Sequence, residues 1–125
     1  MSYEDEYYYQ RLQNLIDGLV ERTRAAIQAD QVLWEQPEHD VYELSLTKTS
    51  MRVFSRDRDG QSPYFFELYD ELGNLVETVE DDGWATRRVK LEDLYNLVSQ
   101  GEKQKAKEAA LQDALNELNI PEPPF

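Results

Sequence analysis

The chain has 125 residues and no cysteine, and 26 acidic side chains against 13 basic ones give it a formal net charge of -13. This length fits one domain with a hydrophobic core, and the lack of cysteine excludes disulfides, thiol catalysis and thiolate metal sites. The acidic excess argues against nonspecific binding to nucleic acid or anionic lipid, because each contact would work against a repulsive field.

The sequence favours a cytoplasmic protein with a single folded unit. No apolar run approaches the roughly twenty residues that cross a bilayer, and the first ten residues are acidic and aromatic, unlike a secretory signal. We predict one α+β domain over residues 1–120. Residues 121–125 are rich in proline, which cannot continue a helix, and are expected to form an extended tail.

Residues 3–29 are predicted to form a helix. Apolar side chains recur there at spacings of three and four residues, which gives one apolar stripe. Ser2 and Asp5 have the spacing of an N-terminal capping box, in which both side chains bond backbone N–H groups. The stripe consists of Leu12, Leu15, Ile16, Leu19, Val20, Thr23, Ala26 and Ile27.

Residues 41–80 are predicted to form a three- or four-stranded antiparallel meander. Apolar and polar side chains begin to alternate at Tyr42, as in a half-buried strand. Residues 41–56 form either one long strand or a hairpin. The polar segment 31–40 before the sheet is expected to be a connector, with Trp34 as a core anchor.

The second half of the meander has the clearest turn in the chain. Tyr64 to Tyr69 is predicted as a strand that alternates, with one face formed by Tyr64, Phe66 and Leu68 and the other by Phe65, Glu67 and Tyr69. The loop 70–74 follows, with Gly73 placed for a left-handed conformation. The chain is expected to return as a last strand from Leu75.

Two helices are predicted within residues 90–119, both packed on one face of the sheet. Gly101 is expected to end the first helix, and Ser99 with Glu102 repeats the capping-box spacing, so a second helix is expected to begin there. The second helix is expected to bury one face, formed by Ala106, Ala110, Leu111, Ala114, Leu115 and Leu118.

Catalysis has little support in the sequence. His39 is the only histidine, and a histidine can act as a general acid or base near neutral pH, but this one lies between acidic residues in a polar connector. Nucleophile-elbow, phosphate-loop and dinucleotide motifs are absent. We therefore predict that the protein is not an enzyme and has no cofactor or metal, with an enzyme that uses a carboxylate or His39 as the least favoured alternative.

A change of charge divides the predicted sheet. The segment from Lys48 to Arg58 is basic, whereas the segment from Asp59 to Trp84 carries eight carboxylates and no lysine or arginine. We expect Arg52 and Arg56 to pair with Glu67 or Glu77 on neighbouring strands, which would fix the register.

The acidic residues at the turns and two N-terminal tyrosines remain as a candidate partner surface. Acidic turns could dock a basic partner, and tyrosine is common at protein interfaces. The candidate residues are Asp70, Glu71, Glu80, Asp81, Asp82, Tyr7 and Tyr8.

The packing and turn residues over residues 12–119 follow one another in a characteristic order. It comprises the leading helix, Trp34-Glu35, a hairpin through Val53, the strand Tyr64 to Tyr69, the loop Asp70 to Gly73, Leu75-Val76, and a helix entered through Leu94-Tyr95. This order resembles a family of small bacterial proteins of unknown function. The resemblance implies a compact α+β domain and carries over no catalytic residue.

The leading hypothesis is a small acidic cytoplasmic module that binds another protein, or a second copy of itself, through an exposed helix or a sheet edge. The alternative is an acidic inhibitor that imitates nucleic acid and binds a basic partner. The acidic excess is spread almost evenly along the chain, which favours the first hypothesis. Nucleic acid, membranes and small-molecule substrates are not expected as partners.

Overall fold

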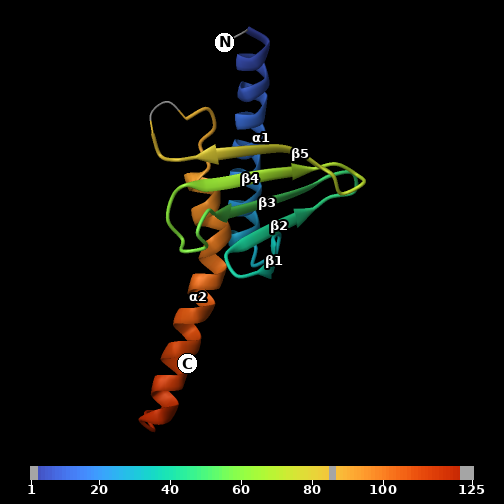
Figure 1. Ribbon diagram of the computed structural model, residues 1–125. Helices are drawn as coiled ribbons and strands as arrows, with labels where there is room; N and C mark the ends of the chain where they lie inside the picture. Colours follow the sequence, from blue (N-terminus) through green and yellow to red (C-terminus); the bar gives the residue numbers. More distant parts are fainter. Residues whose placement is uncertain (1–2, 85–86, 122–125) are drawn as a thin grey trace.

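Two long helices and one antiparallel sheet make up the computed structural model, which describes residues 3–84 and 87–121 (Figure 1). The predicted capping box at Ser2 and most of the predicted tail 121–125 lie outside these residues. Neither helix in the described segments combines the length and the hydrophobicity that crossing a bilayer needs. In chain order the elements are α1 (Tyr3–Gln28), β1 (Glu35–Glu38), β2 (Val41–Ser45), β3 (Ser50–Ser55), β4 (Tyr64–Tyr69), β5 (Leu75–Asp81) and α2 (Glu92–Glu117).

The sheet is a meander in which each strand pairs with the next one in sequence, in the order β1-β2-β3-β4-β5. The predicted α+β fold is confirmed, but the strand number was wrong, because the sheet has five strands rather than three or four. The missed strand is β1, which is polar and exposed along its whole length. It contains Pro37, which an edge strand tolerates because one side of its backbone needs no partner.

Residues 41–56 form the β2–β3 hairpin, which settles the alternative that the sequence left open. The turn is closed by the Leu46 N–H, which donates to the Thr49 carbonyl at 2.8 Å. In this register Glu43 lies opposite Arg52, whose Nε donates to the Glu43 carboxylate at 2.9 Å. Arg52 also lies opposite Glu67 on β4, which is one of the two glutamates predicted to pair with it. Its ion pair is instead with Glu43 on β2.

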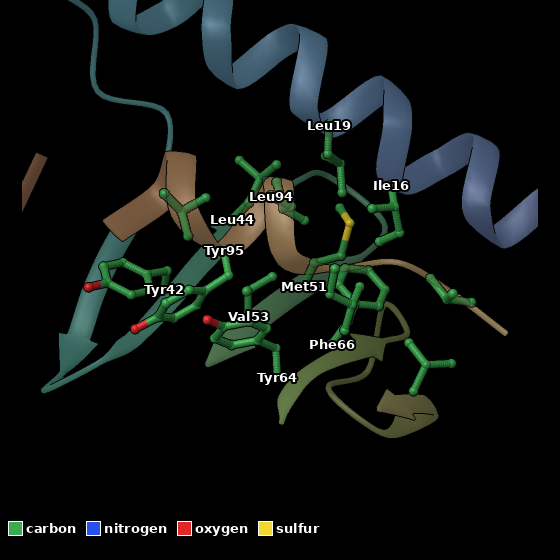
Figure 2. Close-up of a cluster of buried hydrophobic side chains, with 14 of the residues drawn as sticks. Ile16, Leu19, Tyr42, Leu44, Met51, Val53, Tyr64, Phe66, Leu94 and Tyr95 are labelled. Atoms are coloured by element: carbon green, nitrogen blue, oxygen red, sulfur yellow. The ribbon is translucent and has the colours of Figure 1, made fainter. Parts of the chain in front are cut away.

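The hydrophobic core lies between one face of the sheet and the two helices (Figure 2). Alternate side chains of the central strands, Met51, Val53 and Phe66 among them, are buried against this face. Ile16 of α1 and Leu94 of α2 cover them from the helix layer. The period of two in the strands and the apolar stripe of α1 therefore meet as the sequence pattern predicts.

A buried carboxylate joins the sheet to α2. Asp40 lies in the β1–β2 turn at φ 56°, a left-handed conformation that Asp adopts more readily than most residues. One oxygen of its carboxylate accepts the Tyr95 hydroxyl of α2, and the other accepts the Ser55 hydroxyl and the Ser55 N–H. The Ser55 hydroxyl oxygen also accepts the Gly60 N–H at 3.1 Å, so the network extends into the loop before β4.

Tyr95 is enclosed by other aromatic rings. Its ring stacks on Tyr64 with centroids 4.4 Å apart and meets Tyr42 edge-on at 6.2 Å. Burial and the neighbouring Asp40 carboxylate raise the pKa of Tyr95. The phenol therefore stays protonated near neutral pH and remains a hydrogen-bond donor to Asp40.

The two predicted C-terminal helices are joined as one bent helix, α2. Gly101 lies in its interior, and Ser99 is buried and donates to the Asn96 carbonyl instead of capping a new helix. The first part of α2 packs on the sheet, but the rest continues past the sheet (Figure 1). The predicted burial of the second half was therefore wrong, because no other part of the described chain covers it; Leu111 is 62% and Leu118 69% exposed.

Tyr95→Phe is expected to lower the free energy of unfolding by about 1–3 kcal/mol, because the ring is kept while the buried Asp40 carboxylate loses one donor. Tyr64→Phe is the matched control. It removes only a 3.4 Å hydrogen bond to the Gly60 carbonyl and should cost less. Urea unfolding at pH 7 measures both variants, and equal costs would contradict this role of Asp40.

Candidate functional site

The acidic part of the predicted partner surface is divided between the two ends of β5. Asp70 and Glu71 lie in the β4–β5 loop, whereas Glu80 and Asp81 end the strand and Asp82 follows it. A strand of seven residues separates the two groups by roughly 20 Å. The fold therefore does not bring these carboxylates into one cluster.

Asp70 uses its carboxylate within its own loop. One oxygen accepts the N–H groups of Asn74 at 2.9 Å and Leu72 at 3.0 Å. The hydrogen bond from Asn74, followed by that from Leu72, lowers the pKa of Asp70. With Gly73 at φ 85°, these bonds form the predicted hairpin loop, which leaves Glu71 exposed beside it.

Asp81 is an internal helix cap. The residue is 1% exposed, and one carboxylate oxygen accepts the N–H groups of Leu91 at 2.7 Å and Glu92 at 3.3 Å. The other oxygen accepts the Gly83 N–H and lies 3.3 Å from Arg87 Nε in an ion pair whose geometry is not that of a hydrogen bond. A carboxylate at this place satisfies unpaired N–H groups and the positive end of the helix dipole.

The two candidate tyrosines lie near the start of α1. The Tyr8 hydroxyl donates to the Glu77 carboxylate at 2.7 Å and so ties α1 to β5. Tyr7 is the more exposed of the two, and the Arg11 guanidinium lies 5.9 Å from its ring centroid. The hydrogen bond from Tyr8 to Glu77 raises the pKa of Tyr8 to about 12. Their role toward a partner stays a prediction.

The residues considered for catalysis do not face a common opening. His39 is exposed in the β1–β2 turn, while the adjacent Asp40 points its carboxylate to Ser55 and Tyr95. Asp40, Ser55 and Tyr95 are each at most 4% exposed, and none of them lines either of the two hollows described below. Over residues 3–84 and 87–121, no three His, Asp or Glu side chains are grouped so as to hold a metal ion. The chemistry available to this cluster is hydrogen bonding that links the turn, β3 and α2.

The outer face of the sheet is covered by its own arginines. Phe54 and Phe65 stack there with centroids 5.6 Å apart, and the Arg58 guanidinium lies 4.3 Å from the Phe54 centroid. Arg52 lies 5.7 Å from the ring centroid of Tyr69 while it holds Glu43. These side chains are only half-exposed.

A cleft of about 830 Å³ lies between the end of α1, the segment 30–36 and the middle of α2. Apolar side chains of Ile27, Val32 and Trp34 line it, and the Trp34 indole N–H donates to Thr23 at 2.9 Å. On the side of α2 it reaches Gly101 and the residues just beyond. The other hollow, about 400 Å³, lies between α1 and the start of α2 and is lined mainly by charged and amide side chains.

The α2 arm, defined as residues 103–118, leads away from this cleft. All its side chains are exposed except that of Leu115, which is half-buried. Ala106, Ala110 and Ala114 recur every four residues and form one row, with Leu111 and Leu118 beside it. The sequence pattern located these apolar positions but predicted them as buried, whereas no other part of the described chain covers them.

The protein has no match among known proteins in three comparisons: no family model, no curated protein and no solved structure corresponds to it. Membership of the bacterial family that the sequence resembles therefore stays a prediction. The cleft and the α2 arm are the candidate functional site on the geometry alone.

Replacing the internal cap should affect stability far more than replacing its exposed neighbour. Asp81→Ala is expected to cost about 1–2 kcal/mol of unfolding free energy, because the first N–H groups of α2 lose their acceptor. Asp82→Ala removes only a loop contact to the Trp84 N–H and should stay within about 0.5 kcal/mol. Thermal and urea unfolding measure both, and similar losses would be inconsistent with the cap.

Glu77→Gln is expected to lower the pKa of Tyr8 from about 12 toward the ordinary value of 10.0, because the hydrogen-bonding carboxylate is lost. The raised pKa means that the folded state favours the neutral phenol. Its contribution to stability is therefore complete below pH 10 and is lost as the pH rises toward about 12. An NMR titration of the tyrosine ring carbons measures this, and a Tyr8 that titrates at 10 in the wild type would rule it out.

Proposed function

We propose that the protein is a small acidic cytoplasmic module for protein–protein interaction, and that the α2 arm is its docking element. The observation that carries the proposal is a segment of 16 residues, helical as far as Glu117, in which Leu111 and Leu118 are exposed. At 1.5 Å per residue such a segment extends about 24 Å. This length matches the helical elements that dock into grooves or pair with other helices.

The energetics support a partner for the arm. Helices of about 12–15 residues are marginal in water on their own, so the arm depends on nucleation by the packed first half of α2. Full burial of a leucine side chain contributes about 1.5–3 kcal/mol, and Leu111 and Leu118 are both available for it. Docking of the apolar face would therefore stabilise both the arm and the complex.

The distribution of acidic side chains supports the interaction module over the nucleic-acid mimic. A mimic needs its carboxylates on one surface, whereas Asp70 and Glu71 lie at the opposite end of β5 from Glu80 and Asp82. Asp81 is buried and serves as a helix cap.

Site-specific photocrosslinking tests the proposal. A photoreactive residue placed at Leu111 in the full chain, in the cells that make it, is expected to give a covalent protein adduct. The same residue at Lys48, in the exposed β2–β3 turn, is the control and should give little or none. If Leu111 yields no adduct with any protein, a second copy included, the proposal is wrong.

A second variant relates the adduct to the apolar face. Leu118→Glu, made with the photoreactive residue still at Leu111, is expected to abolish the adduct, because a carboxylate would have to be buried at the interface. Leu72→Glu places the same charge on a leucine that is 86% exposed in the β4–β5 loop and should leave the adduct unchanged. Both sites are exposed, so circular dichroism should show an unaltered fold in each case.

A further inference from the structure

We propose that the partner of the α2 arm is a second copy of this chain, paired antiparallel with a two-fold axis at Ala110. The inference deepens the proposed function and rests on it, since it takes the same arm as the docking element. Three observations carry it: the order of charges along the arm, the repulsion that this order creates within one copy, and the row of alanines between the charges.

Charge is segregated along the arm. Residues 103–107 carry three lysines and no carboxylate, and residues 108–117 carry three carboxylates and no basic residue. All six side chains are exposed. The basic residues are Lys103, Lys105 and Lys107, and the acidic residues are Glu108, Asp113 and Glu117.

This order destabilises a single arm. Lys103 and Lys107 are four residues apart on one side of the helix, and so are Asp113 and Glu117. Like charges at this spacing oppose helix formation by about 0.2–0.5 kcal/mol per pair. The last turn of α2 has no basic residue, so Glu117 also lies against the negative end of the helix dipole. These two like-charge pairs and the position of Glu117 therefore do not stabilise the isolated helix.

An antiparallel second copy reverses each of these effects. Lys103 precedes Ala110 by seven residues and Glu117 follows it by seven, while Lys107 and Asp113 are each three residues away. A two-fold axis at Ala110 therefore places Lys103 and Lys107 of one copy opposite Glu117 and Asp113 of the other, in four pairs by symmetry. Parallel pairing would instead set lysines against lysines, so the charges select the antiparallel orientation.

The side chains between the charges suit a close pair of helices. Ala106, Ala110 and Ala114 lie on the same side of α2 as the four charged residues. In this register Ala106 faces Ala114 of the other copy, and small side chains let two backbones approach each other. Leu111 and Leu118 border the row and would be covered at its edge.

The cleft lies outside this pairing. Gly101 precedes Ala110 by nine residues, which is half a turn more than two full turns of helix, so it lies on the opposite side of α2 from the row of alanines. Lys105, which also lines the cleft, is on that opposite side as well.

Sedimentation velocity of the full chain, over a wide range of protein concentration, tests the inference. The wild type is expected to dimerise, and the dimer should weaken at 1 M salt, where the Debye length falls to about 3 Å. Lys103→Glu with Lys107→Glu is expected to raise the dissociation constant at least tenfold. Lys105→Glu lies on the opposite side of the arm and is the control that should change it little.

The reciprocal variant removes net charge as an explanation. Asp113→Lys with Glu117→Lys changes the formal net charge from -13 to -9, at two units per substitution, which by itself would favour association. We still expect it to lose the homodimer at least tenfold. An equimolar mixture of the two double variants should form a heterodimer of wild-type affinity, because every opposed pair is then complementary.

Each outcome decides the matter. A wild type that stays monomeric at every concentration, or a mixture that fails to restore the dimer, overturns the second copy as partner. If the photoreactive residue at Leu111 then gives an adduct with a different protein, the proposed function stands without this inference. Absence of both dimer and adduct overturns the two together, and circular dichroism of each variant confirms that loss of pairing is not loss of folding.

Discussion

Two buried carboxylates hold the first turns of α2, and the arrangement of the helix layer depends on them. Asp40 comes from the turn before β2 and accepts the Tyr95 hydroxyl, while Asp81 comes from the end of β5 and accepts the first N–H groups of the helix. They reach α2 from opposite parts of the meander. Each is satisfied by several donors, which is the condition under which a carboxylate is tolerated in a protein interior.

This attachment at one end leaves α2 free at the other. The helix has 26 residues, about 39 Å at the usual rise, and only its first part lies over the sheet. The core is completed by Leu94, Tyr95 and Val98, before Gly101 is reached. From Lys103 onward the side chains of α2 are exposed except that of Leu115, so the fold consists of a packed body and an exposed helical arm.

Local patterns were enough to predict most of the fold. The apolar stripe of α1, the alternation in β4 and the Asp70 to Gly73 loop were all predicted, because each depends on residues close together in sequence. β1 was missed, since an exposed polar edge strand with Pro37 has no apolar period. The helix cap could not be foreseen either, because Asp81 lies ten residues before Leu91 and the capping box is a contact within one turn.

In the candidate site, too, local patterns were predicted while contacts between distant residues were not. The apolar positions of the α2 arm were predicted, and so was their burial within the chain. That burial was wrong, because a sequence pattern does not say whether another part of the same chain covers an apolar face. The sequence left open whether the acidic turns share one surface, and β5 keeps the two turns at its opposite ends. The role of these carboxylates toward a partner stays a prediction.

Gly101 lies at the boundary between the packed part of α2 and the arm. No atom outside its own stretch of helix lies within 4 Å of where a Cβ would be, and glycine weakens a helix by about 1 kcal/mol relative to alanine. A residue with low helix propensity therefore lies where the packed part of α2 meets the arm. Small changes in the backbone there alter the direction of the whole arm, so this residue sets how far apart and at what angle two bodies joined through their arms would stand.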